Sequence, residues 1–323
     1  MALEGEAKKR YGQIKKRLSE LSTQFANNVL DATQAWYKHF TDPQDLAGLP
    51  DSALEQAAQA AKQKDLEGYV TTLDIPSFLA VMTYAEDRAL RRETYTAFVT
   101  RASAEGQKAD GSSAAEWDNT AIIDETLALR HELAQLLGFN NYAERSLATK
   151  MADSTEQVIN FLTELAEKSK PLAEQDVQQL RAFAEKEGCT DLRAWDLAYF
   201  SEKLRQADYA LSQEELRPYF PAERVISGLF EVVKRLYDID IVPVASFDSW
   251  HPDVRFYQIY KDGEHIAGFY FDIFARENKR GGAWMADCRV RRQTTNGVQR
   301  PVAFLTCNFT PPVGETPSLL SHD

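Results

Sequence analysis

Strand-forming residues crowd into one stretch of this chain, from Val254 to Cys307. Val254–Tyr260 and Glu264–Phe274 are rich in Phe, Tyr, Ile and Val, and Lys261-Asp262-Gly263 lies between them. Because an Asp-Gly pair favours the tight turn of a two-stranded hairpin, these segments predict one β-hairpin.

Two further strands are expected after the hairpin. Ala283–Val290 follows Gly281 and Gly282, and its side chains alternate at period two, which is typical of a strand. Pro301–Phe309 is a nearly continuous apolar run, which suits a strand covered on both faces. The sequence therefore predicts a small sheet of four strands.

The residues ahead of this sheet are helical in pattern. Apolar residues recur at steps of three and four from Glu4 to Trp36, and similar stripes continue until a helix that starts at Pro221 ends near Tyr237. The expected fold class is therefore mainly α, with a large multi-helix body at 1–237 and a small β-sheet near the C-terminal end, at 238–323.

Four local features add detail to this prediction. Ser52 is expected to cap a short helix, and Phe78–Ser103 is expected to form one helix. Ser103–Ser113 has the Gly, Ser and Asp content of an exposed loop. Pro171 is expected to kink or end the helix that contains it, because proline lacks the N–H that a helix interior requires.

Charge and cysteine content restrict the partners and the compartment. The 323 residues include 37 Lys and Arg and 49 Asp and Glu, a net charge of −12, which argues against binding nucleic acid or an anionic membrane. The three cysteines are widely spaced and form no CxxC motif, so a reducing cytoplasm fits best. Neither an apolar run of about 18 residues nor a signal-peptide core is visible.

Motifs that carry chemistry are missing from the sequence. No two of the five histidines have the i, i+4 spacing of a zinc helix, and Gln135 stands where a second histidine after His131 would be needed. No G-x-S-x-G, P-loop or G-x-G-x-x-G motif occurs. Cys288 and Cys307 are expected to be buried strand residues. The residues alone therefore assign neither a catalytic group nor a metal ligand.

Five segments nevertheless resemble the thimet oligopeptidase family of zinc metallopeptidases, and the likeness covers essentially the whole chain. In chain order, they are Asp74–Ser103, Leu136–Ala152, Ala194–Phe200 (AWDLAYF), Phe269–Cys288 and Pro301–Phe309 (PVAFLTCNF). The resemblance implies a hydrolase, a zincin-type metalloprotease that degrades short peptides. An alternative of a different class is a non-catalytic peptide-binding or scaffold protein.

The resemblance also locates the zinc site. In that family an HExxH helix follows shortly after a Ser-His-Asp sequence, and this chain ends at Ser321-His322-Asp323. The chain is therefore expected to be an internal fragment that lacks its zinc helix, to bind no zinc and to be inactive alone. The full-length enzyme is expected to contain zinc.

Substrate binding is expected at the entry to the third strand. In the resembled family this part of the sheet borders the channel in which a peptide lies beside an edge strand. Gly281, Gly282 and Ala283 would let a ligand backbone approach closely, because no side chain larger than a methyl group blocks it. The other interpretation is an ordinary turn, in which the glycines supply positive φ angles.

Overall fold

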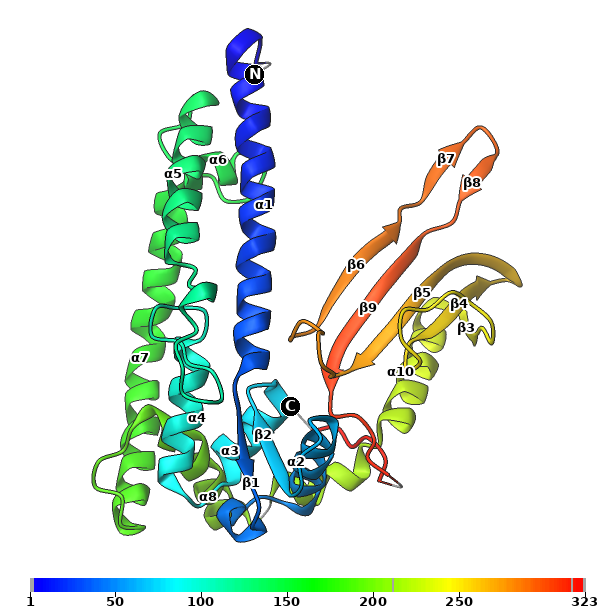
Figure 1. Cartoon of the computed structure of the whole chain (residues 1–323). Coiled ribbons are helices and arrows are strands. Elements are labelled where there is room, and N and C mark those ends of the chain that lie inside the picture. The colour runs from blue at the N-terminus through cyan, green and yellow to red at the C-terminus, as the bar shows by residue number, and fades with distance from the viewer. Residues whose placement is uncertain (1–2, 211, 315, 322–323) are drawn as a thin grey trace. The chain divides into compact units, whose positions relative to one another are not determined.

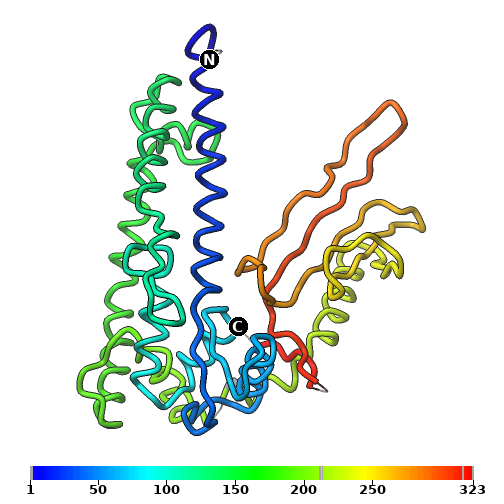
Figure 2. The backbone as a smooth tube through the Cα atoms, viewed as in Figure 1, coloured from blue at the N-terminus to red at the C-terminus, as the bar shows by residue number. Residues whose placement is uncertain are grey.

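A computed structural model describes residues 3–210, 212–314 and 316–321. Figures 1 and 2 trace the chain from its N-terminus in blue to its C-terminus in red. Contacts between residues group it into two compact units. The first unit comprises 1–37 and 91–204, and the second comprises 38–90 and 205–323. The sequence analysis instead divided the chain after Tyr237, between a helical body and a β-rich part. That division by secondary-structure content stays a prediction.

The first unit is built from helices. They are α1 (Gly5–Ala35), α4 (Arg88–Thr100, from Arg91 onward), α5 (Thr120–Leu136), α6 (Tyr142–Leu147), α7 (Thr155–Lys186) and α8 (Leu197–Tyr209, up to Leu204), with short 3₁₀ turns at Ala115–Trp117 and Ala194–Asp196. Helices α1 and α5 lie side by side (Figure 1). Two ion pairs join them, Arg10–Glu132 and Arg17–Glu125, each at 2.6 Å.

A buried ion pair anchors the start of α8 in this unit. Asp196, in the AWDLAYF segment, is fully buried and accepts a hydrogen bond from Arg91 of α4 at 2.9 Å. The Arg91 guanidinium also lies 4.0 Å from the centroid of the Tyr199 ring. Tyr199 and Phe200 pack in turn against Leu180 of α7. The acidic residue of this segment therefore has a structural partner.

The second unit contains two groups of elements. The first group is β1 (Tyr37–Phe40, from Lys38 onward), α2 (Asp51–Gln63), β2 (Tyr69–Thr72) and α3 (Ile75–Tyr84), with a 3₁₀ turn at Pro43–Leu46. The second group is α9 (Gln213–Leu216), a 3₁₀ turn at Arg217–Tyr219, α10 (Ala222–Tyr237), β3 (Asp240–Pro243), β4 (Arg255–Lys261), β5 (Glu264–Phe274), β6 (Trp284–Arg289), β7 (Arg292–Thr294), β8 (Gly297–Gln299) and β9 (Val302–Phe309). The predicted mainly α class is confirmed for the chain as a whole.

The large sheet of this unit has the strand order β3-β4-β5-β9-β6. β4 and β5 form the predicted hairpin, and Asp262 and Gly263 both have positive φ, as a tight hairpin turn requires. β9 runs parallel to β5, and β6 runs antiparallel to β9. The expected four strands are present, and β3 adds a fifth beside β4.

Helix α10 covers one face of this sheet (Figure 1). Its Phe230 ring packs against Tyr257, Phe269 and Phe271, with a centroid distance of 5.0 Å to Tyr257. Tyr270 belongs to a separate ring cluster with Phe256, Trp250 and Phe304. The two faces of β5 therefore both carry aromatic packing.

Three local predictions were wrong, and a fourth was wrong in part. α2 begins at Asp51 after Pro50, and the Ser52 hydroxyl instead donates to Glu214 at 3.3 Å. The expected helix Phe78–Ser103 is interrupted, because Asp87 accepts a hydrogen bond from the Ala89 N–H and begins α4. α7 continues through Pro171, so the proline does not end this helix, and a kink at Pro171 stays a prediction. Cys288 is exposed, because it lies on the outermost strand of the sheet.

Candidate functional site

Strand β6 forms one edge of the five-stranded sheet. Trp284, Met285 and Ala286 pair with Thr306, Leu305 and Phe304 of β9, and the register shifts between Asp287 and Arg289. Within the described ranges, no strand pairs with the other side of β6. Its residues from Met285 onward are exposed. An edge strand of this kind presents backbone N–H and C=O groups that an extended peptide can pair with.

The predicted substrate-binding residues Gly281, Gly282 and Ala283 lie in the turn that leads into this edge. Gly282 has φ +94°, a conformation that favours glycine. A Cβ added to Gly281 or Gly282 would meet no atom of the described chain within 4 Å. The turn is therefore open on the side where the glycines lack side chains. Their role in binding a peptide stays a prediction.

Two side chains, those of Asn308 and Arg280, hold the shape of this turn. The Asn308 side-chain amide of β9 donates to the carbonyl oxygens of Gly282, at 2.6 Å, and Arg280, at 3.0 Å. The Arg280 guanidinium lies over the Trp284 ring, 4.6 Å from its centroid. Asn308 thus joins the glycine pair to β9, and Arg280, the residue before the pair, contacts Trp284, the first residue of β6.

A buried carboxylate holds the beginning of the same loop. Asp272, near the end of β5, is 5% exposed and accepts hydrogen bonds from Arg276 at 2.6 and 2.8 Å, Lys279 at 2.8 Å and the Trp250 indole at 3.1 Å. Burial by itself raises the pKa of the Asp272 carboxyl, but these donors together hold that pKa well below its usual range. Asp272 is therefore ionised.

Lys279 completes this cluster from the loop. Its ammonium group donates to the Asp272 carboxylate and to the backbone carbonyls of Asp272, at 3.0 Å, and Phe274, at 2.6 Å. Burial lowers the pKa of Lys279, opposed by its hydrogen bond to Asp272. Its three donors thus have three oxygen partners, and the loop backbone is tied to the end of β5.

This cluster was not predicted from the sequence, although the sequence contains one signal of it. Asp272 interrupts the otherwise apolar run Phe269–Phe274, and a buried acid needs partners. Its partners Arg276 and Lys279 come from an irregular loop, so no helical or strand period relates them to Asp272.

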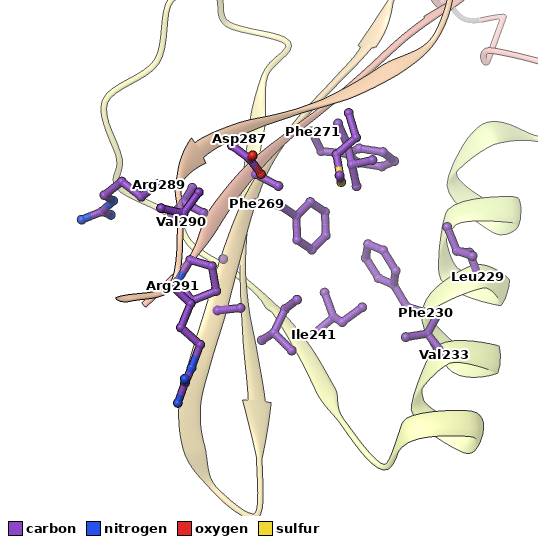
Figure 3. Close-up of a pocket in the computed structure, with 18 residues that line it drawn as sticks. Leu229, Phe230, Val233, Ile241, Phe269, Phe271, Asp287, Arg289, Val290 and Arg291 are labelled. Carbon is purple, nitrogen blue, oxygen red and sulfur yellow. The ribbon is translucent and has the colours of Figure 1, made fainter. Parts of the chain in front are cut away.

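An apolar groove lies between β6 and α10 (Figure 3). Its volume is about 460 Å³, and its walls include Leu229 and Phe230 of α10, Met285 of β6 and Leu305 of β9. Met285 is 66% exposed and Leu305 is 36% exposed, so the groove leaves apolar surface uncovered. Arg289 and Arg291 lie on the side of the groove away from α10.

The arrangement of potential metal ligands decides whether the described residues can form a zinc site. In the part of the chain that the structure describes, no group of three His, Cys, Asp or Glu side chains is placed to hold a metal ion. His39 and His265 contact backbone carbonyl oxygens, and His251 lies beside Asp253. His322 lies outside the described residues. These residues do not fit a zinc site.

Of the helices described, none is both long and apolar enough to cross a membrane.

Sequence comparison identifies the protein family of the chain that contains this sheet and loop. The model of peptidase family M3 matches residues 81–323, so this chain is a member of that family. The predicted resemblance to zinc oligopeptidases is thereby confirmed at the level of the family.

Individual relatives match along almost all of the chain. It is 53% identical over 326 residues to oligopeptidase A of Escherichia coli (strain K12), which covers 100% of this chain and 47% of the relative. It is 44% identical over 339 residues to the organellar oligopeptidase A, chloroplastic/mitochondrial, of Arabidopsis thaliana, which covers 99% of this chain and 41% of the relative. It is 31% identical over 307 residues to dipeptidyl carboxypeptidase of E. coli (strain K12), which covers 94% of this chain and 44% of the relative. The chain spans about half the length of these relatives.

Proposed function

We propose that this chain is part of a zinc metalloendopeptidase that hydrolyses short peptides. The observation that carries this proposal is its membership of peptidase family M3, together with 53% identity over the whole chain to an oligopeptidase A. The described residues supply no zinc ligand set, so the ligands are proposed to come from another part of the enzyme.

The role proposed for this chain is to hold the peptide. The free side of β6 offers backbone hydrogen bonds, which bind a peptide without reading its side chains. Gly281 and Gly282 leave room for the peptide backbone at the entry to that strand, and Ala283 adds only a methyl group. Asp272 and Asn308 act as positioning residues, because they fix the two ends of the loop that carries the glycines.

The proposed compartment is the cytoplasm. Cys189, Cys288 and Cys307 form no disulfide with one another, which suits a reducing environment. Family membership supports peptides as the partners, and the net charge of −12 argues against nucleic acid or an anionic membrane.

The proposal can be tested by completing the chain with the parts of E. coli oligopeptidase A that it does not match, and by measuring peptide hydrolysis. Gly282→Val should lower kcat/KM at least about tenfold, roughly 1.4 kcal/mol, because the new side chain enters the space left for the peptide. Gly263→Val is the matched control. Gly263 also has positive φ and open space, at the tip of the β4–β5 hairpin, so the backbone strain is similar.

The outcomes separate the two parts of the proposal. A completed wild-type enzyme that folds, binds zinc and hydrolyses no peptide would contradict the peptidase assignment and favour a non-catalytic peptide-binding or scaffold protein. Equal losses in the Gly282 and Gly263 variants would remove the peptide-binding role of the glycines while leaving the peptidase assignment in place.

A further inference from the structure

We propose that residues 289–300, here named the arginine hairpin, recognise carboxylate groups of a peptide that lies along β6. The hairpin contains β7 and β8 and joins β6 to β9. The inference rests on the proposed function in one respect, that a peptide is the ligand. It adds a preference for acidic peptides, which backbone pairing along β6 cannot supply.

The charge of the hairpin is opposite to that of the chain. Residues 289–300 include Arg289, Arg291, Arg292 and Arg300 and no Asp or Glu, whereas the whole chain carries −12. All four arginines are exposed. Among the described residues, their guanidinium groups form neither an ion pair nor a side-chain hydrogen bond, so their donors are available to a ligand.

The hairpin is an ordered platform. β7 and β8 pair in register from Arg292 and Gln299 to Thr294 and Gly297. The Thr294 hydroxyl donates to the Gly297 carbonyl at 2.7 Å across the turn. At its base, the Gln299 amide donates to the Val290 carbonyl at 2.9 Å. A fixed backbone lowers the entropy lost when the arginine side chains bind a ligand.

The hairpin continues the line of the proposed peptide-binding edge. Figures 1 and 2 show β7 and β8 extending beyond the ends of β6 and β9. Arg291 and Arg292 follow the last residue of β6 by two and three positions, and a strand rises about 3.3 Å per residue. A peptide that pairs with β6 therefore reaches them with a few additional residues.

Guanidinium groups select carboxylates as their partners. The planar fork of arginine donates two parallel hydrogen bonds to a carboxylate, and an ionised pair is stronger than a neutral one. The carboxylate can come from Asp or Glu side chains or from the C-terminus of the peptide. Nucleic acid is disfavoured, because the net charge is negative and residues 289–300 contain no aromatic ring on which a base could stack.

Binding of short, fluorescently labelled peptides to the chain, followed by anisotropy at low salt, tests the inference. Two peptides differ only in carrying Glu or Gln at the variable positions, and each is made with a free and an amidated C-terminus. The Glu peptide should bind at least about tenfold more tightly than the Gln peptide, and the difference should shrink at high salt. Amidation identifies any contribution of the C-terminal carboxylate.

The arginines are tested by the double variant Arg291→Gln/Arg292→Gln, in which the preference should fall to about threefold or less. Lys8→Gln/Lys9→Gln is the matched control, because it removes the same charge from exposed residues of α1 and should keep the preference. Equal binding of Glu and Gln peptides to the wild type, with no loss of affinity on amidation of the C-terminus, would overturn the inference. It would leave the edge-strand proposal intact, since the amidated Gln peptide reports on the edge. A preference that survives the arginine changes, or tighter binding of a single-stranded oligonucleotide, would also overturn it.

Discussion

The Asp272 carboxylate balances two cationic side chains that the fold has largely removed from water. Lys279 is 4% exposed and Arg276 is 20% exposed at the side chain. Asp272→Asn preserves the shape of the side chain but leaves both cations without their counter-ion. We expect the free energy of unfolding, measured by urea denaturation, to fall by about 3 kcal/mol, because a buried charge without a partner is costly.

A matched control for this variant is Glu223→Gln. Glu223 pairs with Arg255, but its side chain is 68% exposed, so removing its charge should change the free energy of unfolding by less than about 1 kcal/mol. Losses of similar size in the two variants would show that the Asp272 cluster contributes no more than a surface ion pair.

The same variant should reveal the pH dependence of the cluster. The pKa of Asp272 is depressed in the folded chain, so its contribution to stability is complete above the unfolded pKa, about 4, and is lost as pH falls toward the folded pKa. The difference in unfolding free energy between wild type and Asp272→Asn should therefore shrink below about pH 4. A difference that stays constant down to pH 3 would contradict the ionised, hydrogen-bonded state of Asp272.

At the scale of elements, the sequence predicts segments whose signals are local. The β4–β5 hairpin has an Asp-Gly turn, α9 has the capping pair Ser212 and Glu215, and α10 starts after Pro221. β3 escaped prediction because Asp240–Pro243 is only four residues long and ends in proline. β7 and β8 escaped because strands of three residues, with Val298 as their single large apolar side chain, are too short to show an alternation.

The edge of β6 makes a prediction that requires no change to the protein. Pairing along one strand uses the N–H groups of alternate peptide residues, because successive N–H groups point to opposite sides. Two series of binding peptides are N-methylated, one at the odd-numbered residues and one at the even-numbered residues. Binding should weaken at least about tenfold in one series and only slightly in the other. Competition with a labelled peptide measures both series. Equal weakening of binding in the odd-numbered and even-numbered series would exclude strand pairing as the binding mode.

For the whole molecule, the resemblance of five segments predicted the family correctly, whereas periodicity could not predict how distant segments associate. Arg217 shows why. Its guanidinium donates to the Ser52 hydroxyl at 3.1 Å, to Glu214 at 3.0 Å and to the Leu319 carbonyl at 3.0 Å. These contacts join three parts of the second unit that are remote in sequence. Capping and hydrophobic patterns describe single elements and carry no information about such contacts.

The uncovered groove beside β6 predicts that the chain associates with itself. Met285 and Leu305 expose apolar surface next to a free strand edge, a combination that promotes association in water. Sedimentation velocity should show a concentration-dependent increase in mass. Met285→Glu should weaken this association about tenfold, because a charge replaces a methionine whose burial is worth about 1.5 kcal/mol or more.

The control is Met151→Glu, which introduces the same charge at a methionine that is 99% exposed and lies in the first unit. Its effect on association should be small, because a methionine surrounded by water in the monomer is not part of the groove. A wild-type chain that stays monomeric at all concentrations, or equal effects of the two substitutions, would show that the groove is not the surface of association. A selective effect of Met285→Glu would instead place the contact on the face that β6, β9 and α10 share.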